Sequence, residues 1–434
     1  MYDIVDRKLL RVGHVALEVQ GYNGQVLLVW GGYTQNPNQE TLDQEYHDPS
    51  EILLYDPMVA RWTIKTTKGH IPPANSGACG VVVGDLLYIY GGYFGDPDLE
   101  GNSNNIYQLN LFTWIWTRLE PDATRCKPLH RDKLFGWAYN NKVFFFGGFG
   151  TPADDDRNAD QYDYIPDRSH QWYMGRGWNN QLVAYNINSN RWEWPETSGL
   201  PPSPRAALAG FRCQSRVYIF GGRLQGTRLN DLYVLDLKSM SWSENLNPGK
   251  LFPCGRSWHS FTYVGSSKAI LYGGLSAEGE VLGDCWMYDI DRNNWTEIPL
   301  KVSDKRLWHQ SVKVDSDWIV IGGVRSNIHS YQPDGTVYAE NMLSMSVTPK
   351  TLLRCCVESI AKYVGHGDPF SIGYSYTSYL SITRLSYTYN SFFVFLFFSS
   401  SFLICPKMLR CMWSCGVHFF YQGLSTNLIF LEIT

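Results

Sequence analysis

The sequence lacks several features that would assign the chain to a common functional class. Its formal net charge is only −4 over 434 residues, so no excess of positive charge indicates binding to nucleic acid or to a membrane surface. Residues 1–10 contain no apolar segment typical of a secretory signal. The 10 cysteines include no C-x-x-C pair, and none is spaced from paired histidines as in a zinc finger. We therefore expect reduced cysteines, no cofactor, no metal, and a cytoplasmic and/or nuclear location.

Helical periodicity is also scarce, whereas glycine and aromatic residues are abundant. The chain contains 39 Gly, 16 Trp and 28 Tyr, a composition that favours many short strands joined by tight turns. One unit recurs six times: an apolar strand ends in Gly-Gly, and a second strand follows after a loop. The Gly-Gly strands span residues 26–32, 86–92, 143–148, 217–222, 269–274 and 318–323.

A strand with a late tryptophan completes each of the first five units, and an earlier strand precedes each Gly-Gly strand. The tryptophans are Trp62, Trp116, Trp192, Trp242 and Trp295. Four strands at a period of about 50 to 60 residues are typical of a kelch blade. In such a blade, Gly-Gly ends a strand with positive φ, and the late tryptophan covers the gap between blades. The predicted fold class is therefore all-β, with a six-bladed kelch β-propeller over residues 1–347. The sixth unit has no late tryptophan, so the N-terminal residues are a candidate source of its fourth strand.

A short C-terminal α-helix is predicted over residues 348–365. Thr348 can cap its start. Leu352, Cys356 and Ile360 then recur at every fourth position and form an apolar stripe.

Residues 366–434 form an atypical tail rich in Phe, Ser and Tyr, which we expect to be irregular. Its most apolar run, 392–398, is much shorter than the ~20 residues that a membrane-spanning helix needs. Membrane insertion is therefore not expected. The sequence leaves open whether the tail is functional or is the aberrant end of an isoform.

Positions that differ between otherwise matching repeats are candidates for function. Directly after Gly-Gly, the six units have Tyr33, Tyr93, Phe149, Arg223, Leu275 and Val324. Only the fourth unit places a guanidinium there, and Arg228 follows five residues later. Paired arginines can hold a carboxylate, and a hydroxyl such as that of Ser257 adds a hydrogen-bond donor. Because a propeller gathers such loops on one face, we expect a basic pocket with aromatic walls. The candidate wall residues are Tyr33, Trp178, Trp258 and Trp308, of which Trp258 and Trp308 fit a place in the core equally well.

Other polar residues recur in register and are expected to be structural. Arg131, Arg205, Arg256 and Arg306 occupy one repeat-equivalent position, as expected of side chains that tie blades together. His259 and His309 are also repeat positions, and no carboxylate or serine spacing marks either as a base. No catalytic residue is predicted. The acidic insert between Gly148 and Trp178 is either a lid or a solvated loop.

Several short strings surround these candidate residues. They are GAC at 77–79, RDKL at 131–134, RGWN at 176–179, PRAA at 204–207, FGGR at 220–223, TRLNDL at 227–232, RSWH at 256–259 and RLWH at 306–309. Together they resemble kelch domain-containing proteins 1 and 2, which are substrate receptors of cullin-RING ubiquitin ligases. The resemblance extends over about residues 11–365.

The resemblance implies recognition of protein C-termini that end in glycine. The family's carboxylate-binding residues correspond to Arg223, Arg228 and Ser257, and its basic pocket residue corresponds to Lys133. Its aromatic wall corresponds to the four wall residues named above. Phe149 stands where the family can carry tyrosine, so a hydroxyl is lost there.

The resemblance also implies partners. Thr351, Leu352, Cys356 and Ile360 resemble the BC box, the helix with which such receptors dock the elongin B/C pair through elongin C. The cullin box expected soon afterwards is missing, so we expect poor recruitment of a cullin. Two alternatives stay open: a kelch scaffold without a ubiquitin-ligase role, and a propeller enzyme whose site these motifs do not reveal.

Overall fold

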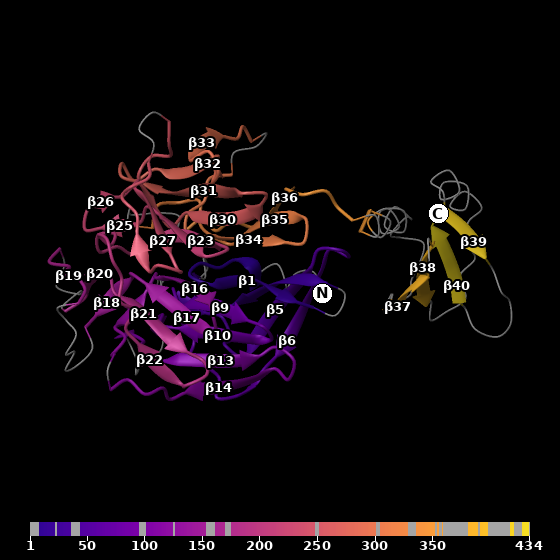
Figure 1. The fold of residues 1–434 in the computed structure, drawn as a ribbon, viewed down its shortest axis with the longest axis horizontal. Coiled ribbons are helices and arrows are strands. Elements are labelled where there is room, and N and C mark those ends of the chain that lie inside the picture. Colours follow the sequence, from indigo (N-terminus) through magenta and orange to yellow (C-terminus); the bar gives the residue numbers. More distant parts are fainter. Residues whose placement is uncertain are drawn as a thin grey trace. The chain divides into compact units, whose positions relative to one another are not determined.

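The computed structural model describes most of the first 358 residues and, beyond them, the residues of four strands (Figure 1). The described residues are 8–358, with gaps at 22–23, 36–43, 95–100, 125, 153–160, 170–174, 248–250, 301–303, 329–335, 352–353 and 356–357, and then 381–388, 391–397, 417–420 and 428–433. The chain divides into two units, 1–358 and 359–434.

Six antiparallel sheets repeat one pattern within the described residues of the first unit. In the first sheet, the strands β1 (Val15–Gln20), β2 (Gln25–Trp30), β5 (Glu51–Asp56) and β6 (Arg61–Thr66) pair in that order. The second sheet contains β9 (Cys79–Val83), β10 (Leu86–Tyr90), β13 (Ile106–Asn110) and β14 (Ile115–Leu119). The third contains β16 (Phe135–Tyr139), β17 (Lys142–Phe146), β21 (Leu182–Asn186) and β22 (Arg191–Glu193). The fourth contains β23 (Ala209–Cys213), β24 (Arg216–Phe220), β27 (Leu232–Asp236) and β28 (Ser241–Trp242).

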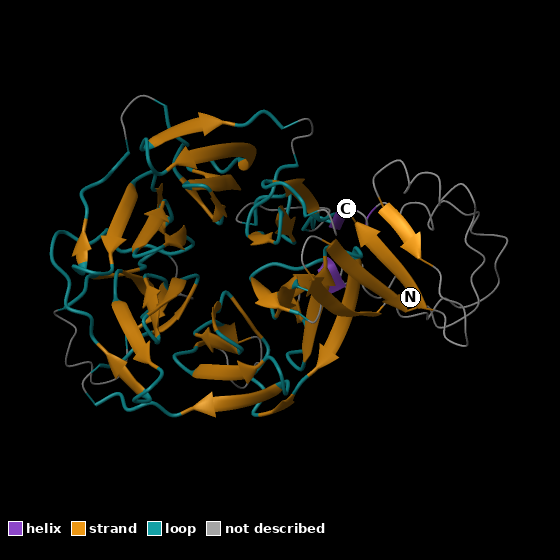
Figure 2. Ribbon diagram, turned by 45° about the vertical axis from the view of Figure 1, so that its right-hand side comes forward, coloured by secondary structure: helices purple, strands orange, loops and turns teal. Residues whose placement is uncertain are grey.

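The last two sheets continue the series. The fifth contains β30 (Ser260–Gly265), β31 (Lys268–Ser276), β32 (Val281–Asp289) and β33 (Asn294–Glu297). The sixth contains β34 (Gln310–Val314), β35 (Asp317–Ile321) and β36 (Leu343–Ser346). The innermost strands contact one another in chain order, and β34 contacts β1. The sheets therefore surround a common axis as the blades of a propeller (Figure 2), and the predicted kelch propeller is confirmed.

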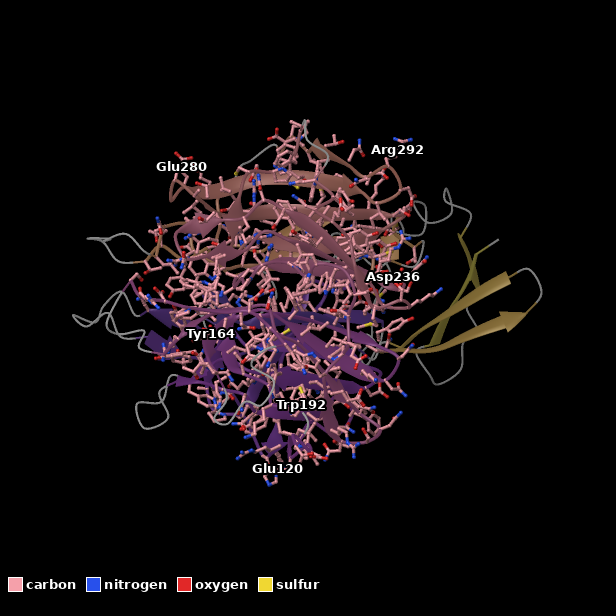
Figure 3. All side chains as sticks on the ribbon, turned by 60° about the vertical axis from the view of Figure 1, so that its left-hand side comes forward. Glu120, Tyr164, Trp192, Asp236, Glu280 and Arg292 are labelled. Atoms are coloured by element: carbon pink, nitrogen blue, oxygen red, sulfur yellow. The ribbon has the colours of Figure 1, made fainter. Side chains whose placement is uncertain are left out.

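The late tryptophans pack between blades as predicted. In the second to fifth blades, the late tryptophan meets the residue that directly precedes Gly-Gly in the blade before it. The ring centroids of these pairs are 5.5 Å apart for Trp116 and Trp30, 5.2 Å for Trp192 and Tyr90, 5.3 Å for Trp242 and Phe146, and 5.4 Å for Trp295 and Phe220 (Figure 3 labels Trp192). The sixth blade, without a late tryptophan, uses Trp318 of β35, whose ring lies 5.6 Å from that of Tyr272.

A buried arginine ahead of the first strand ties most blades to the blade before. Arg131 Nη1 donates to the carbonyl of Gly147 in its own blade at 2.9 Å, while its backbone carbonyl accepts the N–H of Gly92 in the preceding blade, also at 2.9 Å. The same two links are made by Arg205, Arg256 and Arg306. This is the structural role that their shared repeat position predicts.

Arg11 closes the ring and is a member of this set that the repeat comparison missed. Its carbonyl accepts the N–H of Gly323 in the sixth blade at 2.8 Å, and its Nη1 donates to the carbonyl of Gly31 in the first blade at 3.0 Å. β1 is the innermost strand of the first blade. The expectation that N-terminal residues complete the sixth blade is therefore wrong for residues 8–20, and the sixth sheet has three strands in the described part of the chain.

The C-terminal helix is described at only three of its residues. Arg354, Cys355 and Glu358 are helical, and the hydroxyl of Thr351 accepts the N–H of Arg354 at 3.3 Å. Thr351 is thus the N-cap, three residues later than the predicted Thr348. The predicted elongin-binding residues lie outside the described residues: Leu352, Cys356 and Ile360.

The tail contains strands where the sequence predicts irregular structure. The strands β37 (Ser381–Thr388), β38 (Ser391–Phe397), β40 (Leu428–Ile433) and β39 (Val417–Phe420) pair in that order. These segments are rich in Phe, Ile, Val and Thr, which favour strands. Among the residues that the structure describes, no helix is both long enough and apolar enough to cross a membrane.

Candidate functional site

A ring of repeat-equivalent residues surrounds the propeller axis. Each member follows the blade-tying position by two residues and has a left-handed backbone. The members and their φ angles are Gly13 (65°), Gly77 (69°), Lys133 (54°), Ala207 (53°), Trp258 (55°) and Trp308 (57°). From Gly77 onward, the N–H of each member donates to the carbonyl of the preceding member at 2.7–2.9 Å. We call these six residues the axial ring.

The axial ring lies at the end of the propeller where Gly-Gly terminates the second strand of each blade. In the first blade, for example, Val15 at the start of β1 pairs with Trp30 at the end of β2. Left-handed backbone costs a residue with a side chain about 1–2 kcal/mol, and for a bulky residue it is rare. The chain nevertheless places two tryptophans and a lysine in this conformation. Their backbones are held in it by hydrogen bonds between neighbouring blades.

The side chains of the axial ring meet near the axis. The rings of Trp258 and Trp308 are 5.5 Å apart, and Tyr33 lies edge-on to Trp308 at 5.9 Å. Lys133 Nζ lies 5.6 Å from the centre of the Trp308 ring. Lys133 belongs to the third blade and Trp308 to the sixth, so this contact extends across the axis.

A two-stranded hairpin carries both candidate arginines. β25 (Arg223–Leu224) pairs with β26 (Thr227–Arg228), and Arg223 and Arg228 are direct partners in the register. Ala206 holds the hairpin through hydrogen bonds of 3.0 and 2.8 Å with the backbone of Arg223. Arg223 Cζ lies 5.8 Å from the centre of the Trp178 ring, and Arg228 Cζ lies 6.0 Å from that of Trp258. Both guanidinium groups are thus within range of a cation–π interaction.

The third blade completes the site. β15 (His130–Asp132) and β20 (Gly177–Asn179) both pair with β18 (Phe149–Thr151). This pairing places the rings of Phe149 and Trp178 5.0 Å apart, and Lys133 Nζ lies 6.0 Å from the Phe149 ring. Eight of the nine predicted residues therefore form one continuous cluster, which we call the axial site. They are Tyr33, Lys133, Phe149, Trp178, Arg223, Arg228, Trp258 and Trp308.

The two arginines make the hairpin side of the axial site strongly cationic. Burial, and then the neighbouring charge of Arg223, lower the pKa of Arg228 to about 10. Arg228 Nε is covered and makes no hydrogen bond with the residues that the structure describes. Lys133, in contrast, forms an ion pair with the buried carboxylate of Asp132. An anion beside the hairpin would offset the charge that disfavours protonated Arg228.

Ser257 is the one predicted residue that the structure does not bring into this cluster. It lies in β29 (Arg256–Ser257), pairs with Leu275 and is fully buried. Its Oγ is covered and has no hydrogen-bond partner among the described residues. The Ser257 hydroxyl is therefore closed off from solvent in the free protein, and its role as a carboxylate donor stays a prediction.

Some features of the site were not predicted. The axial-ring position is shared by three small residues, Gly13, Gly77 and Ala207, and three large ones. All six follow the blade-tying position by two residues. This constant spacing in the repeats could have revealed the axial ring from the sequence. Arg176 Cζ lies 4.7 Å from the centre of the Tyr93 ring, a pairing that neither local sequence indicates. Much of the acidic insert, 153–160 and 170–174, lies outside the described residues, so its role as a lid stays a prediction.

The two histidines are buried away from this chemistry. Burial, followed by the charge of Arg306, lowers the pKa of His309 to about 3, and its Nε2 lies 3.0 Å from Ser260 Oγ. Burial likewise lowers the pKa of His259 well below its usual value. Both are neutral core residues at neutral pH, as their repeat position predicts. In the described part of the chain, no group of His, Cys, Asp and Glu side chains is arranged to hold a metal ion.

The repeated sheets and the cluster of loop residues at one end define the class: a kelch-repeat propeller that gathers cationic and aromatic side chains near its axis. A model of the KLHDC2/KLHL20/DRC7 Kelch-repeats domain matches residues 13–174 and 173–323. Kelch domain-containing protein 2 of Bos taurus is 35% identical over 358 residues, which cover 81% of this chain and 84% of that protein. Kelch domain-containing protein 1 of Homo sapiens is 33% identical over 359 residues, with 81% and 84% covered. The chain belongs to the kelch domain-containing protein 1/2 family.

Proposed function

We propose that the axial site binds the free C-terminus of other proteins, preferentially one that ends in glycine. The observation that carries the proposal is the pairing of Arg223 with Arg228 on one short hairpin, beside the aromatic rings of Trp178 and Trp258. A carboxylate has two oxygens that can accept from such a pair. The lowered pKa of Arg228 indicates that its positive charge lacks a full counter-charge in the free protein.

Glycine as the last residue fits the crowding around the arginines. The neighbouring side chains are large and rigid, and those of Trp178 and Trp258 are almost fully buried. A terminal residue without a side chain brings its carboxylate and backbone amide close to the hairpin at the smallest steric cost. The aromatic faces then cover the apolar parts of the preceding residues.

In this proposal the chain is a non-catalytic substrate receptor of a cullin-RING ubiquitin ligase. The propeller captures the substrate, and the helix that begins at Thr351 docks elongin C, as its resemblance to a BC box implies. The apolar residues assigned to that contact are Leu352, Cys356 and Ile360. Such a receptor acts in the cytoplasm or the nucleus. A kelch scaffold that binds partners without a ligase role is the alternative.

Peptide binding is the direct test. A fluorescent peptide ending in glycine is titrated with the protein as the free acid, as the C-terminal amide, and with one bulky residue added after the glycine. Loss of a buried charge-assisted contact costs about 2–5 kcal/mol, so the amide and the extended peptide should bind at least about 30-fold more weakly. Equal affinity for acid and amide contradicts the proposal and favours the scaffold.

Recruitment of the ligase is tested separately. The full chain is compared in a pull-down with a chimera that carries a normal cullin box after residue 365. Because the residues that follow the helix do not form such a box, both proteins should capture elongin B/C, and the native chain should recover much less cullin. Equal recovery of cullin contradicts our interpretation of the tail.

A further inference from the structure

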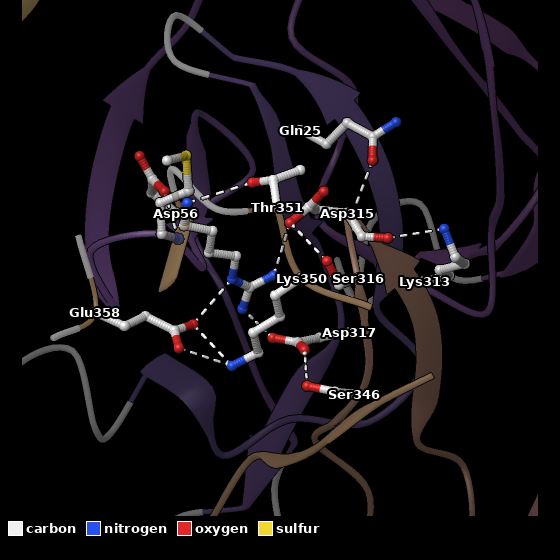
Figure 4. A network of polar contacts seen from close by, with 12 residues as sticks. Gln25, Asp56, Lys313, Asp315, Ser316, Asp317, Ser346, Lys350, Thr351 and Glu358 are labelled. Carbon is white, nitrogen blue, oxygen red and sulfur yellow. Dashed lines mark hydrogen bonds and ion pairs between the residues drawn. The ribbon is translucent and has the colours of Figure 1, made fainter. Parts of the chain in front are cut away.

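Arg354 joins the start of the C-terminal helix to the propeller through a network of carboxylates. Figure 4 labels these carboxylates, which belong to Asp315, Asp317 and Glu358. Its side chain is only 2% exposed. Nη1 donates to Asp315 at 2.8 Å, Nη2 pairs with Asp317, and Nε donates to Glu358 at 2.9 Å one helical turn later. All three nitrogens of the guanidinium group are thus used. Two of the acceptors belong to the propeller and one to the helix.

The propeller carboxylates are themselves held in place. Asp315 lies at the turn between β34 and β35, and its N–H donates to Gln25 Oε1 of the first blade at 2.8 Å. Asp317 Oδ1 accepts from Ser346 Oγ of β36 at 2.8 Å. The network therefore sits where the first and sixth blades meet. Asp315 and Asp317 thus form an attachment point for the helix that is already held in place by other propeller residues (Figure 4).

The charges of this network depend on one another. Burial alone would raise the pKa of Asp315 and of Glu358. Hydrogen bonds hold both pKa values below their usual range: those from Arg354 and then Ser316 at Asp315, and those from Lys350 and then Arg354 at Glu358. Removing one member of a buried ion pair leaves the other charge uncompensated. A change at Arg354 would thus release the helix rather than only weaken one contact.

We propose that Arg354 is a positioning residue, which fixes the direction in which the C-terminal helix leaves the propeller and so holds the helix at a fixed orientation to the axial site. The significance of this orientation rests on the proposed function. Trp308 of the axial site and Asp315 of the network lie at opposite ends of β34, roughly 20 Å apart at ~3.3 Å per residue. One strand therefore connects the peptide site to the helix attachment.

The helical register agrees with this role. At about 100° per residue, Arg354 and Glu358 share one face of an α-helix. The sequence positions of Leu352, Cys356 and Ile360 fall on the opposite face in the same register. In the sequence, the BC-box spacing and the two network residues therefore do not compete for one helix face.

The test measures the orientation of the helix directly in the full chain. Spin labels are placed on Cys355 and Cys254, both of which are exposed, after the other reactive cysteines are replaced by serine. Pulsed electron resonance then gives the distribution of distances between the labels. The protein with Arg354 intact should give one narrow distribution, and Arg354→Gln should broaden it while peptide affinity changes less than about twofold.

Two further variants make the result decisive. Lys350→Gln is the matched control, because Lys350 belongs to the same network but, among the residues that the structure describes, contacts Glu358 and no propeller carboxylate. It should leave the distribution narrow. Arg354→Lys keeps the charge without the planar fork and should give an intermediate width. A narrow distribution in Arg354→Gln, or equal broadening in Lys350→Gln, overturns the proposal. Capture of elongin B/C by the unaltered chain is measured alongside, so failure of the proposed function is seen separately.

Discussion

Two regions of the fourth blade use arginine in opposite ways. Arg205 is fully buried, and its guanidinium group donates to Gly221, to Ser203 and to both oxygens of Asp231. Arg228, on the hairpin that follows Gly-Gly in the same blade, faces the Trp258 ring and leaves Nε without a hydrogen bond among the described residues. The comparison shows how the role of an arginine follows from its acceptors. Where the protein supplies acceptors, the residue holds the blade, and where it supplies an aromatic face instead, we propose that the residue binds a ligand.

The largest expected effect is the loss of the structural arginine. Arg205→Gln leaves the partly buried Asp231 without its partner and removes a link between blades, so the free energy of unfolding should fall by about 3 kcal/mol, the lower end of the range for a buried pair. Chemical denaturation followed by tryptophan fluorescence measures the change. Arg212→Gln serves as the control, because Arg212 is exposed on β23 of the same blade. A change at Arg205 no larger than at Arg212 would contradict the structural role.

Arg228, which we propose binds the ligand, should show the reverse pattern: a large effect on peptide binding and little effect on stability. Arg228→Gln should weaken binding of a glycine-ending peptide by about 2–5 kcal/mol while leaving the thermal midpoint unchanged or slightly raised. The expected direction of the change in the thermal midpoint follows from the pKa of Arg228. Because the folded protein lowers the pKa of Arg228 to about 10, its charge opposes folding at neutral pH, and this cost disappears only as the pH rises past that value. Titration of the peptide by anisotropy and a melting curve measure the two effects. Unchanged affinity would remove Arg228 from the site.

A smaller effect is expected at Phe149 of the axial site. Phe149→Tyr adds a hydroxyl to the ring that lies between Lys133 and Trp178. One new hydrogen bond to the peptide would strengthen binding by about 0.5–1.5 kcal/mol. Phe112→Tyr is the control, because Phe112 is 86% exposed on an outer turn. Weaker binding in Phe149→Tyr would show that the ring is packed too tightly to accept the added oxygen.

The blades and most of the candidate axial site could be predicted from the repeats, because the same local sequence pattern recurs six times. A residue that breaks the pattern, such as Arg223, is visible without any structure. The left-handed backbone of Trp258 and Trp308 was not predictable in this way, since neither residue favours that conformation and the hydrogen bonds that impose it come from neighbouring blades. Burial of the Ser257 hydroxyl likewise depends on packing between strands that are distant in sequence.

The start of the helix was misplaced for a different reason. Thr348 and Thr351 are both capable N-caps, and local propensity does not separate them. The structure begins the helix at Thr351, where the next turn brings Arg354 to its carboxylates. The strands of the tail were missed because a region with few charges and no repeat offers no period from which to predict its pairing.

Because Arg11 closes the ring between the first and sixth blades, the axial site can be completed only late in synthesis. Arg11 and Gly323 are roughly 300 residues apart, whereas the links between the other blades join residues much closer in sequence. A chain emerging from the ribosome can therefore assemble its earlier blades one after another, but this last seam forms only after the sixth blade has left the exit tunnel. The contact between Tyr33 and Trp308 crosses the same seam. An unfinished chain thus has both arginines of the hairpin yet lacks a complete axial site, so the binding that we propose for this site would begin only after synthesis has passed that point.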